Sequence, residues 1–357
     1  MKSVGQRIES LDYIKGVACL IVAYNHFKNI YPLRVTGIFG EYVIRFFTNG
    51  GYMVYIFLGI SFYLAAVKYY RTADYRWGEN VKKRYVSLLL PVLSMYVLVF
   101  LLNKADAFRL YEKVTEITGG GDPAIHYPID DSLKKMMAVG VLKTLISGSS
   151  DYIFTFWMLN RVVKGFLITL IISAIMKENK IKQACFYAVI FLAIIYVNYD
   201  IIYTMCPILS FIAYWFCKAE KEKKNYWTEY MGGGILAIGL LFSLIPGKYS
   251  FMYIPGSILV IVGAVMANNK IKFSMRKLSY LSRISIEIYF IHQPITTTIC
   301  AAIFLLLNRV NVISPNIKIV VLAILYFFIL VLISYFIKWG KNRLRNFIAY
   351  YRKDSFA

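Results

Sequence analysis

The sequence predicts an all-α, polytopic transmembrane helix bundle with about ten spans and both termini in the cytoplasm. Three observations support this prediction. Of the 357 residues, 59% are hydrophobic and the mean hydropathy is +0.57, which is more apolar surface than a soluble core absorbs. Apolar runs of spanning length recur along the whole chain. The basic residues gather in short segments on one side of the predicted bundle.

The predicted spans are each near the length that a bilayer requires. They cover residues 13–31, 51–70, 85–103, 153–176, 182–198, 200–217, 229–247, 251–268, 284–307 and 317–338. Because only short polar segments separate most of them, we expect residues 1–357 to form one integral membrane domain without a fused soluble domain.

One predicted outer loop, at about 104–152, is long enough to hold structure of its own. Gly119 to Pro123 is a turn-forming stretch, and Leu133 to Ile146 is amphipathic, so we expect an interfacial helix there. His126 in the same loop is interpreted as a solvated surface residue.

The distribution of charge sets the orientation. With the N-terminus inside, the cytoplasmic segments hold about 26 of the 41 Lys and Arg residues, and the outer segments about 11. The net charge of +22 therefore reflects topology and anionic lipid rather than nucleic-acid binding. The five cysteines form no CxxC pair, so neither a disulfide framework nor a metal site is expected. The first apolar run, from Ile14, is expected to be a retained helix.

Ionisable side chains inside apolar spans are the first candidates for function, because lipid penalises them. His26 follows Lys15 by eleven residues, close to three helical turns, which puts both on one face ~16 Å apart. Asp12 and Cys19 continue this polar stripe. Two interpretations of His26 remain open from this helix alone: a structural hydrogen bond to a neighbouring helix, or a functional imidazole.

A second histidine lies in the ninth predicted span. Ser285, Tyr289 and His292 share one helix face, and Pro294 follows to loosen the backbone. Glu287 lies roughly 140° around the helix from His292. We therefore expect Glu287 to pair with a cation of a cytoplasmic loop rather than to orient the imidazole.

The fourth predicted span carries two cations in its outer half. Arg161 and Lys164 follow Trp157. One interpretation is a site for an anionic group such as a lipid phosphate or pyrophosphate; the other is snorkelling, or pairing with an acid of the outer loop.

Several segments, in order along the chain, resemble the acyltransferase-3 family of bacterial membrane acyltransferases. The segment Leu11 to Ala18 followed by His26 is similar to the family's signature of a basic residue ahead of a histidine. Lys15 replaces the usual arginine, as in the branch that resembles sugar O-acetylases and the intercellular adhesin membrane protein. The run from Ser285 to Pro294 resembles a second family motif, from which Glu287 departs.

Three further segments add to the resemblance. Lys82 to Arg84 with Pro91 is similar to the family's basic cluster and proline. Val54 to Phe62 and Phe156 to Leu159 are weaker matches, the first because Phe62 replaces a glycine.

The resemblance implies transfer of an acyl group to a hydroxyl of a cell-surface or lipid-linked carbohydrate, in the bacterial cytoplasmic membrane. The group is usually acetyl, and cytoplasmic acetyl-CoA is then a co-substrate rather than a resident cofactor. Many relatives carry an esterase-like extracytoplasmic domain. In this case we expect any esterase-like partner to be a separate protein. Membrane lipid is a further expected partner.

Our hypothesis assigns roles to residues on this basis. His26 is the general base or the acyl carrier, and His292 orients or completes the site. The cations expected to bind the CoA phosphates are Lys15, Lys83 and Arg84. The residues expected to contact the acceptor are Arg161, Lys164, Trp157 and Tyr289, with Asp12 and Ser285 in supporting positions.

The alternative function is an exporter or flippase for a polysaccharide or lipid-linked sugar, since ten helices with buried polar groups suit transport as well. No matched inverted repeat or pair of broken helices is visible in the sequence, which favours the acyltransferase. A structural or sensor protein is the third class, and no feature of the sequence favours it.

Overall fold

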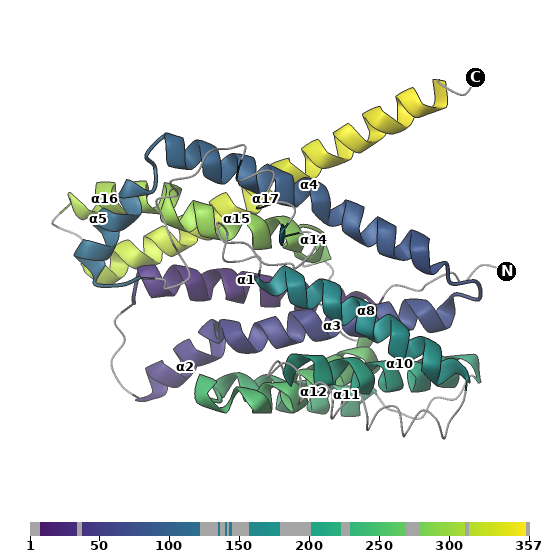
Figure 1. Ribbon diagram of the computed structural model, residues 1–357. Coiled ribbons are helices and arrows are strands. Elements are labelled where there is room, and N and C mark those ends of the chain that lie inside the picture. The colour runs from purple at the N-terminus through teal and green to yellow at the C-terminus, as the bar shows by residue number, and fades with distance from the viewer. Residues whose placement is uncertain are drawn as a thin grey trace.

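The protein is an all-α helix bundle of the polytopic membrane type (Figure 1). The computed structural model describes residues 8–33, 38–121, 157–178, 201–222, 229–268, 279–310 and 314–354, together with residues 135, 140, 143 and 144. Across these ranges the regular structure is helical throughout. The helices are α1 Glu9–Ile30, α2 Ile38–Thr48, α3 Gly50–Arg71, α4 Trp77–Lys104, α5 Arg109–Thr118, α8 Trp157–Glu178, α10 Met205–Lys221, α11 Glu229–Leu241, α12 Tyr253–Met266, α14 Ser279–Arg283, α15 Ser285–Thr297, α16 Ile299–Asn308 and α17 Pro315–Asp354.

Seven helical segments in the described ranges are long and apolar enough to cross a membrane. They are Gly40–Arg71, Trp77–Lys104, Met158–Lys177, Ile201–Lys221, Gly247–Met266, Ser285–Asn308 and Pro315–Arg343. Three predicted features lie outside the described residues: the span 182–198, His126, and the amphipathic piece 133–146 apart from four single residues. The total of ten spans and the cytoplasmic side of the termini therefore stay predictions.

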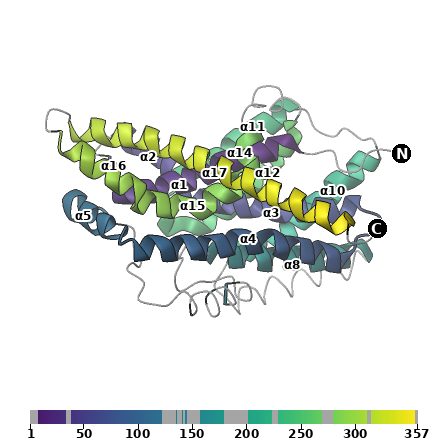
Figure 2. The same ribbon diagram turned by 90° about the horizontal axis from the view of Figure 1, so that it is seen from above.

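Helix α1 is the central helix of the bundle. In Figure 1 it runs between a group formed by α15, α16 and α17 and a group formed by α3, α10, α11 and α12, and it contacts α3, α14 and α15 closely. Figure 2 shows that α4 and α8 flank the same core, and that α1 begins and α17 ends at one end of the bundle. A helix enclosed by other helices does not need an apolar face toward lipid, which explains how α1 carries its polar stripe.

Two tyrosine hydroxyls attach α1 to its neighbours. Tyr326 of α17 donates a hydrogen bond of 3.2 Å to the carbonyl oxygen of Ala23. Tyr31, which ends α1, donates one of 3.0 Å to the carbonyl oxygen of Thr296 in α15. Both hydroxyls are buried, where a satisfied hydrogen bond stabilises and an unpaired group is costly. Together they fix the turn of α1 that carries His26.

Two helices lie where the sequence predicted only loops. Helix α2 precedes α3, and Asn49 lies between them. Asn49 caps α3 by accepting a hydrogen bond of 3.0 Å from the backbone N–H of Tyr52. Helix α5 ends at Gly119, whose φ of +64° lies in the left-handed region that glycine adopts without a steric penalty. The turn predicted at Gly119 is confirmed, whereas α5 itself was missed.

The predicted span 284–307 is two helices rather than one. Helix α15 continues through Pro294, and the break falls at Thr298, whose φ and ψ are −118° and −72°. The Thr298 hydroxyl donates to the carbonyl oxygen of Pro294 at 2.6 Å, and Thr296 donates to that of His292 at 2.6 Å. Such bonds compete with the helical ladder and bend it. The break therefore lies one turn beyond Pro294, the residue that was expected to loosen the backbone.

The long helix α17 is held to α15 by a buried carboxylate. Glu287 is 2% exposed, and its Oε1 lies 3.4 Å from Lys341 Nζ and 3.9 Å from Lys338 Nζ. The expected pairing of Glu287 with a cation is confirmed, but both cations belong to α17 rather than to a loop. Helix α17 continues past this contact and extends away from the bundle (Figure 1).

We expect Glu287→Gln to destabilise the protein by ~1–3 kcal/mol, because it leaves two partly buried ammonium groups without their carboxylate. Thermal unfolding of the purified protein in lipid nanodiscs measures the loss. Glu79→Gln is the matched control, since Glu79 is exposed and pairs with two exposed cations, Arg76 just before α4 and Lys83 within it. Equal melting temperatures for the two variants would mean that the α15–α17 contact does not depend on the ion pair.

Candidate active site

The structure brings together the two histidines that the sequence places in apolar spans. His26 lies on α1 and His292 on α15, and their ring centroids are 5.1 Å apart with an angle of 43° between the planes. They are 266 positions apart in the sequence, so only the packing of α1 against α15 makes this pair. His292 is buried and His26 is partly exposed, so His26 is the imidazole that a substrate reaches more directly.

The backbone of α15 fixes the tautomer of His292. Its Nδ1 lies 2.6 Å from the carbonyl oxygen of Tyr289. Because a carbonyl only accepts, this hydrogen bond requires the proton on Nδ1, and in the neutral ring Nε2 is then the basic nitrogen. The Tyr289 ring packs 5.8 Å from the His292 ring. Tyr289 thus orients the imidazole through both its carbonyl and its ring.

The acceptor-binding candidates on α8 divide into those near this pair and those away from it. Arg161 is partly buried and within electrostatic range of the Tyr289 hydroxyl, which also lies near the backbone of Met158. Lys164, by contrast, is exposed. The side chain of Trp157 lies outside the described residues. The structure therefore groups Arg161 with Tyr289 and His292, and leaves Lys164 apart.

The cations expected to bind CoA also divide. Lys15 places its Nζ 4.8 Å from the centre of the Phe57 ring in α3. Arg84 of α4 lies over the Phe166 ring of α8 at 5.7 Å and is close enough to Lys15 for the two charges to repel. Lys83, by contrast, is exposed and pairs with Glu79 at 3.6 Å. The structure brings Lys15 and Arg84 together and turns Lys83 away.

Two like charges inside a bundle are unfavourable unless an anion lies between or beside them. Asp12 lies near Lys15 and offsets part of its charge. The Nε of Arg84 is buried and, within the described part of the chain, has no hydrogen-bond partner. A buried guanidinium nitrogen without a partner fits a site whose ligand is an anion such as a phosphate.

Asp12 and Ser285 join α1 to the α14–α15 segment at the same end. The hydroxyl of Ser282 donates to Asp12 Oδ1 at 3.2 Å, and the hydroxyl of Ser285 donates to the Ser282 carbonyl at 2.9 Å. The thiol of Cys19 donates to the carbonyl oxygen of Ser285 at 3.0 Å. Both predicted supporting residues therefore fix the register between α1 and α15, on which the histidine pair depends.

Gly16 makes the close approach of α1 to α14 possible. A Cβ at this position would lie 2.8 Å from the backbone nitrogen of Ser282 and 2.9 Å from Cβ of Leu281. Backbone atoms cannot move aside as a flexible side chain would. The glycine that follows Lys15 in the sequence is therefore required by packing.

The site can now be compared with known proteins. The family model described as an acyltransferase domain matches residues 8–339, nearly the whole chain. The chain belongs to the acyltransferase-3 family. Searches of the curated proteins and of the solved structures gave no match.

Membership of the acyltransferase-3 family decides the class of function. The protein is a multi-pass membrane acyltransferase, so the interpretation as an exporter or flippase loses its basis. The matched region includes α1 with Lys15 and His26 and α15 with His292. The residues that face one another in the bundle thus lie within the region shared with the acyltransferase-3 family.

Some contributors to the site could not be found from the sequence. Tyr326 holds the turn of α1 next to His26 and stacks on Phe27 at 4.9 Å, yet it is one of 30 tyrosines and no motif marks it. Lys28 and Arg45 line a cavity at the far end of α1. Lys28 lies inside the predicted span 13–31 and Arg45 in the outer segment that follows, and no motif marks either.

We expect Gly16→Ala to destabilise the protein by ~1–3 kcal/mol, because α1 and α14 must separate to admit the methyl group. Thermal unfolding measures this loss, and acyl-transfer activity should fall with it as the histidine pair is displaced. Gly78→Ala is the control, since nothing lies within 4 Å of a Cβ at that helical position. Unchanged stability of Gly16→Ala would contradict the close helix contact.

Proposed function

We propose that this acyltransferase moves an acetyl group from acetyl-CoA to a hydroxyl of a cell-surface or lipid-linked carbohydrate. The observation that carries the proposal is the histidine pair, with its ring centroids 5.1 Å apart. One member of the pair, His26, lies on the same central helix as Lys15 of the cationic site. The likeness of the Lys15-to-His26 segment to sugar O-acetylases and the intercellular adhesin membrane protein supports this acceptor class. The proposed location is the bacterial cytoplasmic membrane, with a separate esterase-like protein as a candidate partner.

The proposed chemistry is a direct transfer. The acceptor hydroxyl oxygen attacks the thioester carbonyl carbon while an imidazole nitrogen of His26 takes the hydroxyl proton. The C–S bond breaks, and the CoA thiolate leaves and receives that proton. His292 has its Nδ1 proton committed to the Tyr289 carbonyl, which leaves Nε2 as the nitrogen that orients the reacting groups. Arg161 stabilises negative charge near Tyr289.

The donor is proposed to enter where Lys15 and Arg84 lie. CoA is polyanionic, and its phosphates need fixed cations. Lys15 and His26 are separated by ~16 Å along α1, a distance that the extended pantetheine arm of CoA spans. The thioester would then reach the imidazoles while the phosphates stay at the cationic end.

The first test uses membranes from expressing cells and radiolabelled acetyl-CoA. We expect label in lipid-linked or surface carbohydrate with the wild type, and a loss of about a hundredfold or more with His26→Ala and His26→Gln at equal protein level. An empty vector gives the background. Activity of His26→Gln near that of the wild type would return His26 to a structural role.

The same label separates direct transfer from an acyl carrier. Without acceptor, direct transfer leaves the purified protein unlabelled. Hydroxylamine-sensitive label that disappears in His26→Ala would instead show an acyl-histidine intermediate, and His26 would then be the acyl carrier.

A second test addresses the donor site. We expect Arg84→Gln to raise the KM for acetyl-CoA about tenfold with little change in kcat, because the lost charge lies far from the chemistry. Lys83→Gln is the matched control on the neighbouring residue, and we expect no change, since that side chain is exposed and paired with Glu79. Arg84→Lys should recover part of the affinity. If both glutamine variants behave alike, CoA binds elsewhere.

A further inference from the structure

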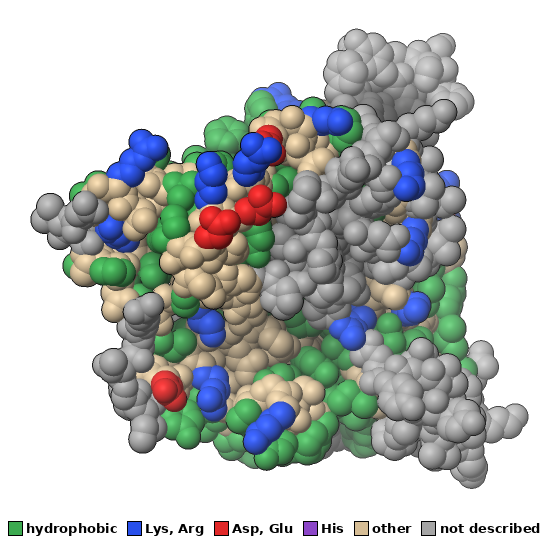
Figure 3. Space-filling view, turned by 60° about the vertical axis from the view of Figure 1, so that its left-hand side comes forward, with side chains coloured by type: hydrophobic (Ala, Val, Ile, Leu, Met, Phe, Trp, Pro, Cys, Tyr) green, Lys and Arg blue, Asp and Glu red, His purple; other side chains and the backbone are tan. Residues whose placement is uncertain are grey.

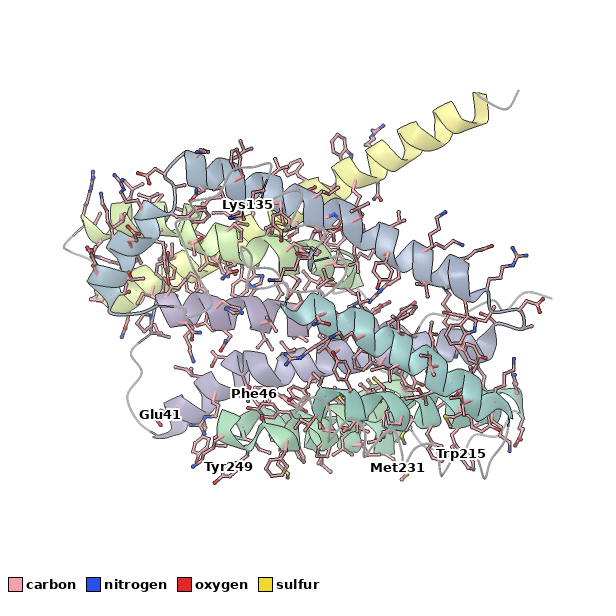
Figure 4. All side chains as sticks on the ribbon, in the orientation of Figure 1. Glu41, Phe46, Lys135, Trp215, Met231 and Tyr249 are labelled. Atoms are coloured by element: carbon pink, nitrogen blue, oxygen red, sulfur yellow. The ribbon has the colours of Figure 1, made fainter. Side chains whose placement is uncertain are left out.

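A cavity with charged side chains in its wall lies at the end of the bundle opposite Lys15 and Arg84. Its volume is about 740 Å³, within the range of small-molecule sites. The last turns of α1, helix α2, the start of α3 and the segment 245–253 form its walls. Figure 4 shows Glu41 of α2 and Tyr249 of that segment at this end of the bundle. Figure 3 brings this end forward and shows Lys and Arg side chains on its surface with a few acidic ones among them.

Two cations converge on this cavity from different helices. Lys28 of α1 and Arg45 of α2 both line it, and they lie close enough for their charges to repel. Lys28 Nζ is held by the hydroxyl of Thr48 at 3.2 Å, and the Arg45 guanidinium lies over the Tyr42 ring at 5.6 Å. Neither of these contacts neutralises charge. An anion between the two side chains would relieve the repulsion.

The start of α3 adds backbone donors to the same wall. Gly50 and Gly51 open this helix and line the cavity, where the first amides of a helix have no partner within it and attract anions. Gly50 is required by packing, because a Cβ there would lie 2.7 Å from Cβ of Asn25. A Cβ at Gly51 would meet no atom closer than 3.6 Å. Packing therefore does not require the second glycine, and without a side chain its backbone is open toward the cavity.

Hydrogen bonds within the protein hold the wall of the cavity in place without a ligand. Asn49 donates from its amide to the carbonyl oxygens of Ser243 and Ile245 at 2.6 and 3.3 Å and to the hydroxyl of Tyr253 at 3.0 Å. Tyr253 in turn donates to the Ile245 carbonyl at 3.0 Å. These bonds join the start of α3 to the segment before α12. A preformed wall lowers the entropic cost of binding.

Glu41 indicates which chemical groups the ligand carries besides the anion. Its carboxylate lies one turn before Arg45 on α2 and lines the cavity with Asn25 and Tyr55. A carboxylate repels a phosphate but accepts hydrogen bonds from hydroxyl groups. The cavity therefore offers cations to an anion and a carboxylate to hydroxyl groups.

We propose that this cavity binds a phosphorylated polyol, with the phosphate between Lys28, Arg45 and the start of α3, and the hydroxyl groups toward Glu41. A sugar phosphate and the headgroup of phosphatidylglycerol share this chemistry. The further step that this cavity is the acceptor site of the enzyme rests on the proposed function. Binding of a phosphate in the cavity does not depend on that function. It lies beyond His26 on α1, at the end remote from the proposed donor site.

The test uses the full chain in phosphatidylcholine nanodiscs and glucose 1-phosphate as the probe, measured by isothermal titration calorimetry without acyl-CoA. We expect binding to the wild type, and binding at least tenfold weaker for Lys28→Gln, for Arg45→Gln and for unphosphorylated glucose. Lys248→Gln is the matched control, because Lys248 lies at the same end, over the Tyr249 ring, and does not line the cavity. Its affinity should equal that of the wild type.

Each outcome has a defined meaning. Equal binding by wild type, Lys28→Gln and Arg45→Gln, or no binding by the wild type, overturns the proposal and leaves the labelling experiments with His26 unaffected. Nanodiscs that contain phosphatidylglycerol identify the source of the phosphate. If they weaken glucose 1-phosphate binding to the wild type, a lipid headgroup occupies the cavity; if they do not, the ligand is a sugar phosphate.

Discussion

The enclosure of α1 by other helices is the constraint on which the rest of the structure depends. This one helix carries Asp12, Lys15, Cys19 and His26 on a polar stripe, and lipid would penalise every polar group that faced it. The bundle shelters them by packing α14 and α15 close against α1, which Gly16 permits, and by closing the other side with α3. The same enclosure creates the low-dielectric interior in which an imidazole pair and a fixed charge act strongly.

Helical periodicity predicted a substantial part of this arrangement. The spacing from Lys15 to His26 and that from Ser285 to His292 set each pair on one face. Adjacent residues on a helix point about 100° apart, so Lys83 and Arg84 had to diverge, but the sequence does not say which of them faces inward. That choice depends on Phe166 of α8, a partner brought near only by tertiary packing.

The features that the sequence did not predict arise from contacts between distant segments or from short polar turns. Helix α2 was missed because Asn49-Gly50-Gly51 is typical of a loop, yet Asn49 caps α3 and connects it to the segment before α12. The break at Thr298 depends on three consecutive threonines bonding back to their own helix, a competition that Pro294 masked. Glu287 found its cations on α17 because that helix crosses α15 there.

The layout along α1 separates binding from chemistry. Lys15 and Arg84 lie near the start of the helix, and His26 lies ~16 Å farther along it, so a single side chain cannot serve both the CoA phosphates and the thioester. A change at the cationic site should therefore act on donor affinity, and a change at the imidazole on the chemical step. Sites this far apart and without shared partners contribute nearly independently to the free energy of the transition state. The central helix thus sets the distance between the two parts of the proposed reaction.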